Sequence, residues 1–198
     1  TTTAAADAAI VDYCATEGVM CTRGAEQDVL SRYAEAAAAC GASTVVRVTS
    51  DCPLIEPGLV DYAIDEYESS VGRCDYVSNM IRPTWPYGMA VEVFSAAVLA
   101  LADREATLPA EREHVTPFIY WRPERFALKS LVRQPDLSHH RWTVDTPEDF
   151  ELVSRIISEL YPRNHRFSME DVLALLDRNP SWVAINAHVQ QKTAESRS

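Results

Sequence analysis

The sequence lacks the features of a membrane protein and of a secreted, disulfide-linked protein. No apolar run approaches the roughly 20 residues that a membrane-spanning helix needs, and the Ala-rich stretch 96–102 is far shorter. No signal-peptide pattern is present. The five cysteines are an odd number at irregular spacing, without a Cys-x-x-Cys motif. This usage favours a reducing compartment over a disulfide framework or a zinc site, and we expect a cytoplasmic protein with no membrane partner.

Basic residues are also scarce. The chain has 18 Lys and Arg against 29 Asp and Glu, a formal net charge of −11. Proteins that bind nucleic acid need cations to displace counterions from phosphate, so this balance argues against a nucleic-acid partner. An acidic enzyme that handles a phosphate substrate needs a divalent cation instead.

What is present is an alternation of helical and strand-like segments in a chain of 198 residues, 47% of them hydrophobic. This length and composition predict one domain with a sizeable core, over residues 1–189, followed by a polar tail at 190–198. The periodicity predicts helices at 6–17, 28–40, 59–69, 96–105, 110–121, 147–160 and 169–176. It predicts strands at 19–21, 43–49, 75–78, 90–94, 126–132 and 142–144.

Such alternation indicates an α/β fold in which helices cover both faces of a mostly parallel sheet. In these folds ligands bind beyond the carboxyl ends of the strands. Two β-branched segments are each followed at once by an aspartate, Asp51 in one case and Asp145 in the other. Mg²⁺ takes one or two carboxylate ligands and completes its shell with water and substrate phosphate. Two aspartates at one edge of the sheet would meet that requirement.

Each aspartate also has a purely structural interpretation. Asp51 lies in a turn before Pro53, a common position for aspartate. Asp145 precedes a helix, but Thr146 is already a good N-cap, and Pro147 and Asp149 suit the first and third helical positions. The cap is therefore complete without Asp145, which leaves its carboxylate available for another role.

Four sequence blocks together carry a family resemblance. They are V-R-V-T-S-D-C-P-L-I-E-P, E-R-E-H-V-T-P-F-I-Y, R-W-T-V-D-T-P-E-D-F-E-L-V and the segment at 23–33. Over residues 6–186 the chain resembles the cytidylyltransferases named after spore-coat polysaccharide biosynthesis. It is also similar to the acylneuraminate and 3-deoxy-octulosonate cytidylyltransferases. The resemblance implies a three-layer, Rossmann-like nucleotide-diphospho-sugar transferase fold.

The resemblance also implies a reaction and a metal. In these relatives, aspartates at the positions of Asp51 and Asp145 hold the catalytic Mg²⁺. A sugar hydroxyl attacks the α-phosphate of CTP, pyrophosphate leaves, and a CMP-sugar forms for surface polysaccharide or glycan biosynthesis. Relatives of this kind form dimers, so a homodimer is expected, with CTP and a sugar as substrates.

Six further residues are candidate substrate contacts. Arg47 and Arg23 carry planar guanidinium groups that match phosphate or carboxylate, although a surface role is the simpler interpretation for Arg23. Glu92 follows a strand-like alternation that would turn it towards the sugar. The cluster formed by Arg112, Glu113 and His114 falls where the family covers its sugar site, and a histidine there is a candidate acid or base.

The chain departs from the family pattern in two places. Where the family has Arg-Gly-Leu-Asp, this sequence has Tyr87-Gly88-Met89-Ala90, which indicates a different sugar or a different sugar site. The Gly- and Arg-bearing loop that wraps the triphosphate, with its first βα unit, is not found. We therefore expect a truncated nucleotidyltransferase domain that is weakly active or inactive on its own.

Two alternatives belong to other classes. One is a non-catalytic remnant or regulatory subunit that keeps the fold. The other is a cysteine hydrolase that uses Cys52 with His114, but the acidic neighbour of Cys52 would raise the pKa of the thiol and disfavours it as a nucleophile.

Overall fold

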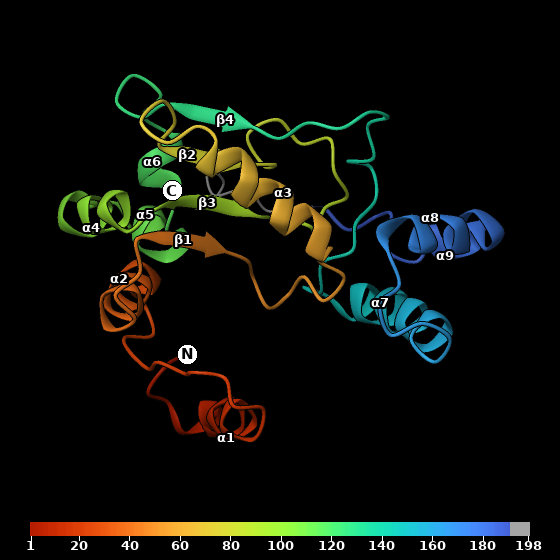
Figure 1. The fold of residues 1–198 in the computed structure, drawn as a ribbon. Coiled ribbons are helices and arrows are strands. Elements are labelled where there is room, and N and C mark those ends of the chain that lie inside the picture. The colour runs from red at the N-terminus through yellow and green to blue at the C-terminus, as the bar shows by residue number, and fades with distance from the viewer. Residues whose placement is uncertain (191–198) are drawn as a thin grey trace. The chain divides into compact units, whose positions relative to one another are not determined.

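The computed structural model describes residues 1–190 and shows a mixed α/β fold (Figure 1). Four strands form an open sheet in the order β1 (Thr44–Arg47), β3 (Glu92–Ser95), β2 (Tyr76–Ser78) and β4 (Leu128–Ser130). The order is not sequential, as expected when helical connections cross over the sheet. The α/β fold class predicted from the sequence is confirmed.

The chain divides into two compact units. The first comprises Thr1–Val45 and Phe94–Leu128, and the second comprises Val46–Val93 and residues 129–190. Of the polar tail predicted at 190–198, residues 191–198 lie outside the part of the chain that the structure describes. The boundary of a single domain at 1–189 stays a prediction.

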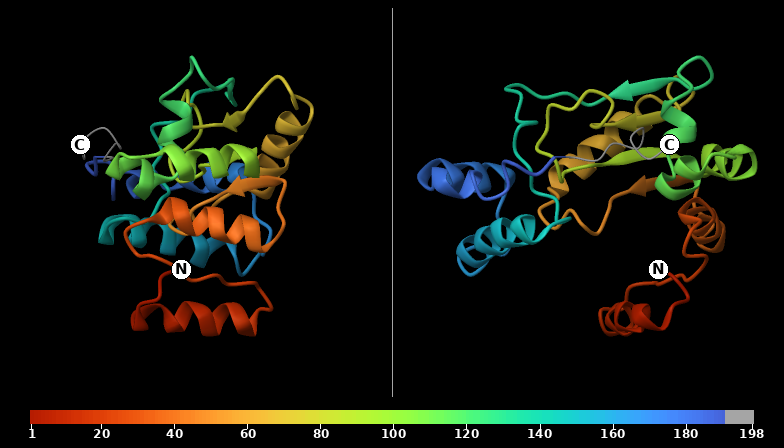
Figure 2. Two further views of the ribbon diagram at one scale, coloured as in Figure 1. Left: turned by 90° about the vertical axis from the view of Figure 1, so that its left-hand side faces the viewer. Right: turned by 180° about the vertical axis from the view of Figure 1, so that it is seen from behind.

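In the first unit, helices pack mainly against one another. Its helical elements are η1 (Ala5–Asp7), α1 (Ala8–Thr16), α2 (Val29–Ala39), α4 (Ala96–Glu105), α5 (Pro109–His114) and α6 (Pro117–Tyr120). Helix α2 packs against α4 and α5, and α6 contacts both α4 and α5 (Figure 2). Leu30, Leu99, Phe118 and Ile119 are buried there. By contrast, α1 contains no buried residue.

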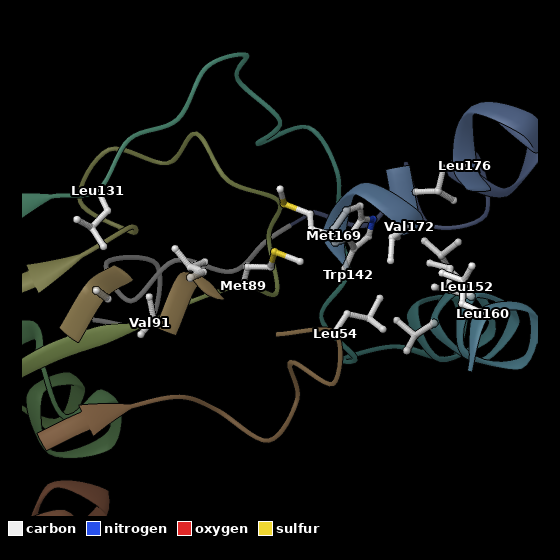
Figure 3. Packing of buried hydrophobic residues seen from close by; sticks show 14 of the residues in the cluster. Leu54, Met89, Val91, Leu131, Trp142, Leu152, Leu160, Met169, Val172 and Leu176 are labelled. Carbon is white, nitrogen blue, oxygen red and sulfur yellow. The ribbon is translucent and has the colours of Figure 1, made fainter. Parts of the chain in front are cut away.

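The second unit holds the main apolar cluster. Its helices are α3 (Pro57–Glu68), α7 (Pro147–Leu160), α8 (Met169–Arg178) and α9 (Pro180–Val183). Helix α3 lies against β2, and α8 contacts both α7 and α9. Figure 3 shows residues from these helices packed with Trp142, which is fully buried, and with Met89 and Leu54. Burial of a large apolar side chain contributes roughly 1.5–3 kcal/mol, so this cluster anchors α7 and α8 to the loops that carry Trp142 and Leu54.

Most predicted elements are present with small shifts at their ends. Helices α4 and α7 have the predicted bounds, and Ser168 caps α8 as expected, accepting a hydrogen bond from Asp171 N at 3.2 Å. The predicted helix at 110–121 is divided into α5 and α6 because Val115 adopts a φ of 74°.

Two predicted strands are absent among the described residues. The segments at 19–21 and 142–144 join no sheet. Close to them along the chain, Gly24 forms an isolated bridge with Thr2, and Arg141 forms one with Tyr87. Helix α9 was not predicted. No helix within residues 1–190 is long and apolar enough to cross a membrane.

Candidate functional site

The loops that carry the two predicted metal ligands meet in the second unit. The carbonyl oxygen of Asp51 accepts a hydrogen bond from Val144 N at 2.8 Å and another from Thr143 Oγ1 at 3.2 Å. Because Asp145 directly follows Val144 in the chain, this hydrogen bond places the backbones of Asp51 and Asp145 close to each other. The side chain of Asp145 is 45% exposed, and Asp51 is half-buried.

Tyr87 lies close enough to the carboxylates of Asp51 and Asp145 for their negative charges to affect its pKa. Burial raises the pKa of Tyr87 to about 12; Arg141 opposes the rise, and the negative charges of Asp145 and Asp51 add to it. The phenol of Tyr87 is therefore neutral throughout the physiological range. From the sequence, Tyr87 was a departure from the family pattern and, with Trp85, a candidate dimer contact; its place beside the two aspartates was not predicted.

The position of Asp145 depends on the start of α7. Thr146 is the N-cap, Pro147 occupies the first turn, and Asp149 completes a capping box. Asp149 Oδ2 accepts hydrogen bonds from the backbone N–H groups of both Asp145 and Thr146 at 3.1 Å. The prediction that the cap is filled without the Asp145 carboxylate is confirmed.

The Asp145 carboxylate instead pairs with Arg141, whose Nη2 lies 2.6 Å from Asp145 Oδ2. Arg141 also binds Asp149, with Nη2 2.8 Å from Oδ2 and Nε 2.9 Å from Oδ1. The Asp149 side chain is fully buried. Burial alone would raise its pKa, but hydrogen bonds from Arg141 and Asn186 outweigh burial and lower the pKa to about 2. Asp149 is thus ionised at physiological pH beside the candidate metal ligand.

The oxygen donors fit a magnesium ion. Two carboxylates are the ligand type that Mg²⁺ prefers, and the ion ordinarily keeps several waters or substrate oxygens as its remaining ligands. No group of three or more His, Cys, Asp or Glu side chains in the described part of the chain is placed to form a closed metal cage. A pair of carboxylates would leave most of the coordination shell of such an ion open to water and to a phosphate substrate.

Arg47 and Glu92, both in the second unit, are ion-paired with each other. The Glu92 side chain is 6% exposed and also accepts a hydrogen bond from Tyr76 Oη at 2.5 Å. These contacts give both residues a structural role. Direct contact of either residue with a substrate stays a prediction.

The other four candidates lie in the first unit. Arg23 donates to the carbonyl oxygens of Thr2 and Ala4 at 2.8 and 2.9 Å, which agrees with the simpler surface interpretation. Arg112 pairs with Asp28 and Asp103. Glu113 and His114 end α5, Glu113 being exposed and His114 partly buried. A role of these residues in substrate binding stays a prediction.

The thiol of Cys52 is poorly suited to nucleophilic attack. Burial raises its pKa, a hydrogen bond from Thr49 opposes the rise, and the charge of Asp51 adds to it. Cys52 Sγ lies 3.5 Å from Asp51 Oδ1. The less reactive, protonated form is therefore favoured, which disfavours the cysteine-hydrolase alternative.

A cavity of about 210 Å³ in the second unit borders the same segment. Its lining includes His139, His140, Arg141, Trp142 and Asn186. Burial, reinforced by the charge of His139 and opposed by that of Asp177, lowers the pKa of His140 to about 4. His140 is therefore neutral at physiological pH and packs against the Trp142 ring, with ring centroids 5.4 Å apart.

Comparison with known proteins places this arrangement in a family. Residues 1–166 match the cytidylyltransferase family. The uncharacterized protein MJ1063 of Methanocaldococcus jannaschii is 34% identical over 191 residues, which cover 94% of this chain and 75% of that protein. The spore coat polysaccharide biosynthesis protein SpsF of Bacillus subtilis is 29% identical over 174 residues, covering 85% and 69% of the two chains.

A solved structure gives the same result. The structure of a cytidylyltransferase from Leptospira borgpetersenii matches with a TM-score of 0.88 and 30% identity, over 98% of this chain and 79% of that one. The match shows the Rossmann-like nucleotidyltransferase fold that the sequence predicted. The chain belongs to the cytidylyltransferase family.

Proposed function

We propose that the protein is a Mg²⁺-dependent cytidylyltransferase that joins CTP and a sugar into a CMP-sugar and releases pyrophosphate. The observation that carries the proposal is the hydrogen bond from Val144 N to the Asp51 carbonyl, because it brings together the two loops whose aspartates would hold the metal. Similarity to the spore coat polysaccharide biosynthesis protein of Bacillus subtilis supports a place in surface polysaccharide biosynthesis.

In this proposal Asp51 and Asp145 supply two anionic oxygen ligands. When bound, Mg²⁺ would neutralise charge on the nucleotide phosphates and favour attack on the α-phosphate. The protein's part is to hold the two carboxylates in place. Asp51 is held through its own carbonyl, and Asp145 through its N–H, which donates to Asp149. Tyr87 stays protonated beside them, so it adds no third negative charge.

Calorimetric titration of CTP in the presence and absence of Mg²⁺ tests the proposal. We expect Mg²⁺ to tighten CTP binding by at least about tenfold, because the acidic site otherwise repels the triphosphate. ATP titrated under the same conditions should bind more weakly than CTP. Asp51→Asn and Asp145→Asn should each remove the effect of Mg²⁺.

Asp61→Asn is the matched control, because Asp61 is an exposed aspartate on α3 in the same unit. It should bind CTP and Mg²⁺ as the wild type does. If Mg²⁺ left CTP binding unchanged in the wild type, or if the two site variants behaved like Asp61→Asn, the proposed metal role would be wrong. A homodimer and a cytoplasmic location stay predictions from the family resemblance.

A further inference from the structure

The ion pairs around Arg141 are unequal, and the inequality points to a function. One guanidinium contacts two carboxylates: Nη2 is shared between Asp145 Oδ2 and Asp149 Oδ2, and Nε donates to Asp149 Oδ1. Asp149 therefore binds the guanidinium in a two-point, side-on geometry. Asp145 meets the guanidinium through the shared Nη2. Two-point Arg–carboxylate pairs are the more tightly fixed kind.

Burial increases the difference. The Asp149 side chain is fully buried, whereas that of Asp145 is 45% exposed. Asn186 Nδ2 also anchors the buried pair, donating to Asp149 Oδ1 at 2.8 Å and to the Arg141 carbonyl at 2.9 Å. Arg141 is thus held in place by Asp149, and Asp145 is its exchangeable partner, because the Asp145 carboxylate is open to solvent whereas that of Asp149 is buried.

The exchangeable partner is also the proposed metal ligand. We propose that Arg141 is a positioning residue that holds the Asp145 carboxylate as an ion pair in the absence of metal and competes with the divalent cation for it. This inference rests on the proposed function of Asp51 and Asp145. The ion pair would offset repulsion between the two nearby aspartates before the metal arrives. It would also weaken the binding of free metal ions, so that the cation is taken up together with the nucleotide phosphates.

Measuring metal binding in the absence of nucleotide tests whether Arg141 competes with the cation for the Asp145 carboxylate. Mg²⁺ and Mn²⁺ affinities would be measured by calorimetry for the wild type, Asp145→Asn, Arg141→Gln, and the double variant Arg141→Gln/Asp149→Asn. Loss of the ion pair between Arg141 and Asp145 should tighten metal binding by about two- to fivefold. The single variant leaves the buried Asp149 without its guanidinium partner and is expected to be unstable. The double variant removes both charges together and leaves the net charge unchanged.

Arg163→Gln provides the control, because Arg163 pairs with Glu159 at 2.6 Å in an exposed i,i+4 pair in the same unit. Its metal affinity should equal that of the wild type. The inference is supported if Asp145→Asn abolishes metal binding and the double variant binds the metal more tightly. Unchanged or weaker binding by the double variant would overturn the role of Arg141 and leave the metal pair intact. If Asp145→Asn binds metal normally, the metal pair itself is wrong, and the Arg141 proposal with it.

Discussion

Replacing Asp149 by alanine should destabilise the protein strongly, although this residue is not a proposed metal ligand. Its carboxylate accepts hydrogen bonds from Arg141 Nε and Nη2, from Asn186, and from two backbone N–H groups at the start of α7. Removing one partner of a buried ion pair costs about 3–5 kcal/mol, because the remaining charge is left buried without compensation. For a protein of this size that loss lowers Tm by roughly 6–20 °C.

The measurement is urea unfolding followed by tryptophan fluorescence, since Trp142 and Trp182 lie in the same unit. Glu151→Ala is the matched control: Glu151 lies on the same helix and pairs with Arg155 at 2.6 Å, but its side chain is 51% exposed. We expect the control to cost less than about 1 kcal/mol. If Asp149→Ala unfolded within 1 kcal/mol of Glu151→Ala, the reasoning about the buried anion would be refuted.

The low pKa of Asp149 sets the pH range of its contribution. The pKa falls from 3.8 to about 2 on folding, so the folded state is stabilised above about pH 4, and this stabilisation is lost as the pH falls towards 2. A shift of this size corresponds to about 2 kcal/mol, a lower bound on the effect of the substitution. The difference in unfolding free energy between wild type and Asp149→Asn should therefore shrink as the pH falls through this range.

Three further predictions concern the segments that frame the site. Gly88→Ala should cost at least about 3 kcal/mol in thermal unfolding, because Gly88 has a φ of 101° and a Cβ there would lie 2.5 Å from the Trp142 carbonyl carbon. Gly18→Ala, with a φ of 67° but open space around it, should cost only about 1 kcal/mol, and equal losses would contradict the steric argument. His140 has a pKa lowered from 6.5 to about 4, so the unfolded chain takes up a proton first and stability falls by up to about 3 kcal/mol between pH 6.5 and pH 4. His140→Gln should flatten that fall in urea unfolding series; an unchanged pH dependence would exclude His140 as its source. Glu92→Ala should lower stability by about 3 kcal/mol through loss of its buried contacts with Arg47 and Tyr76, and a variant as stable as the wild type would argue that Glu92 is reserved for substrate.

The sequence predicts local features of this site better than its long-range pairing. Thr146, Pro147 and Asp149 are recognisable as a helix start because caps depend on residues three positions apart. The ion pair between Arg141 and Asp149 joins a residue that precedes α7 to one in the first turn of α7, so neither helix nor strand periodicity places the two side chains together. A positive charge shortly before an acidic helix start was the available signal.

The predicted strand at 142–144 fails for a related reason. Its β-branched and aromatic residues are typical of a strand, but its backbone donors bind single partners on two different loops. Trp142 N donates to the Tyr87 carbonyl at 2.6 Å, and Val144 N donates to that of Asp51 at 2.8 Å. The same contacts bring Asp51 next to Asp145, so the segment positions the candidate site without joining the sheet. Propensity alone does not distinguish these outcomes, because tertiary partners decide strand pairing.

The central claim is that Asp51 and Asp145 bind one shared metal ion. Its most direct test is Mn²⁺ binding followed by electron paramagnetic resonance for the wild type, the variants Asp51→Asn and Asp145→Asn, and the double variant. If one ion is shared, each single substitution should weaken binding by at least about tenfold, and the double variant should lose little more than either single. Losses that add independently, or single variants that bind Mn²⁺ as tightly as the wild type, would contradict the claim.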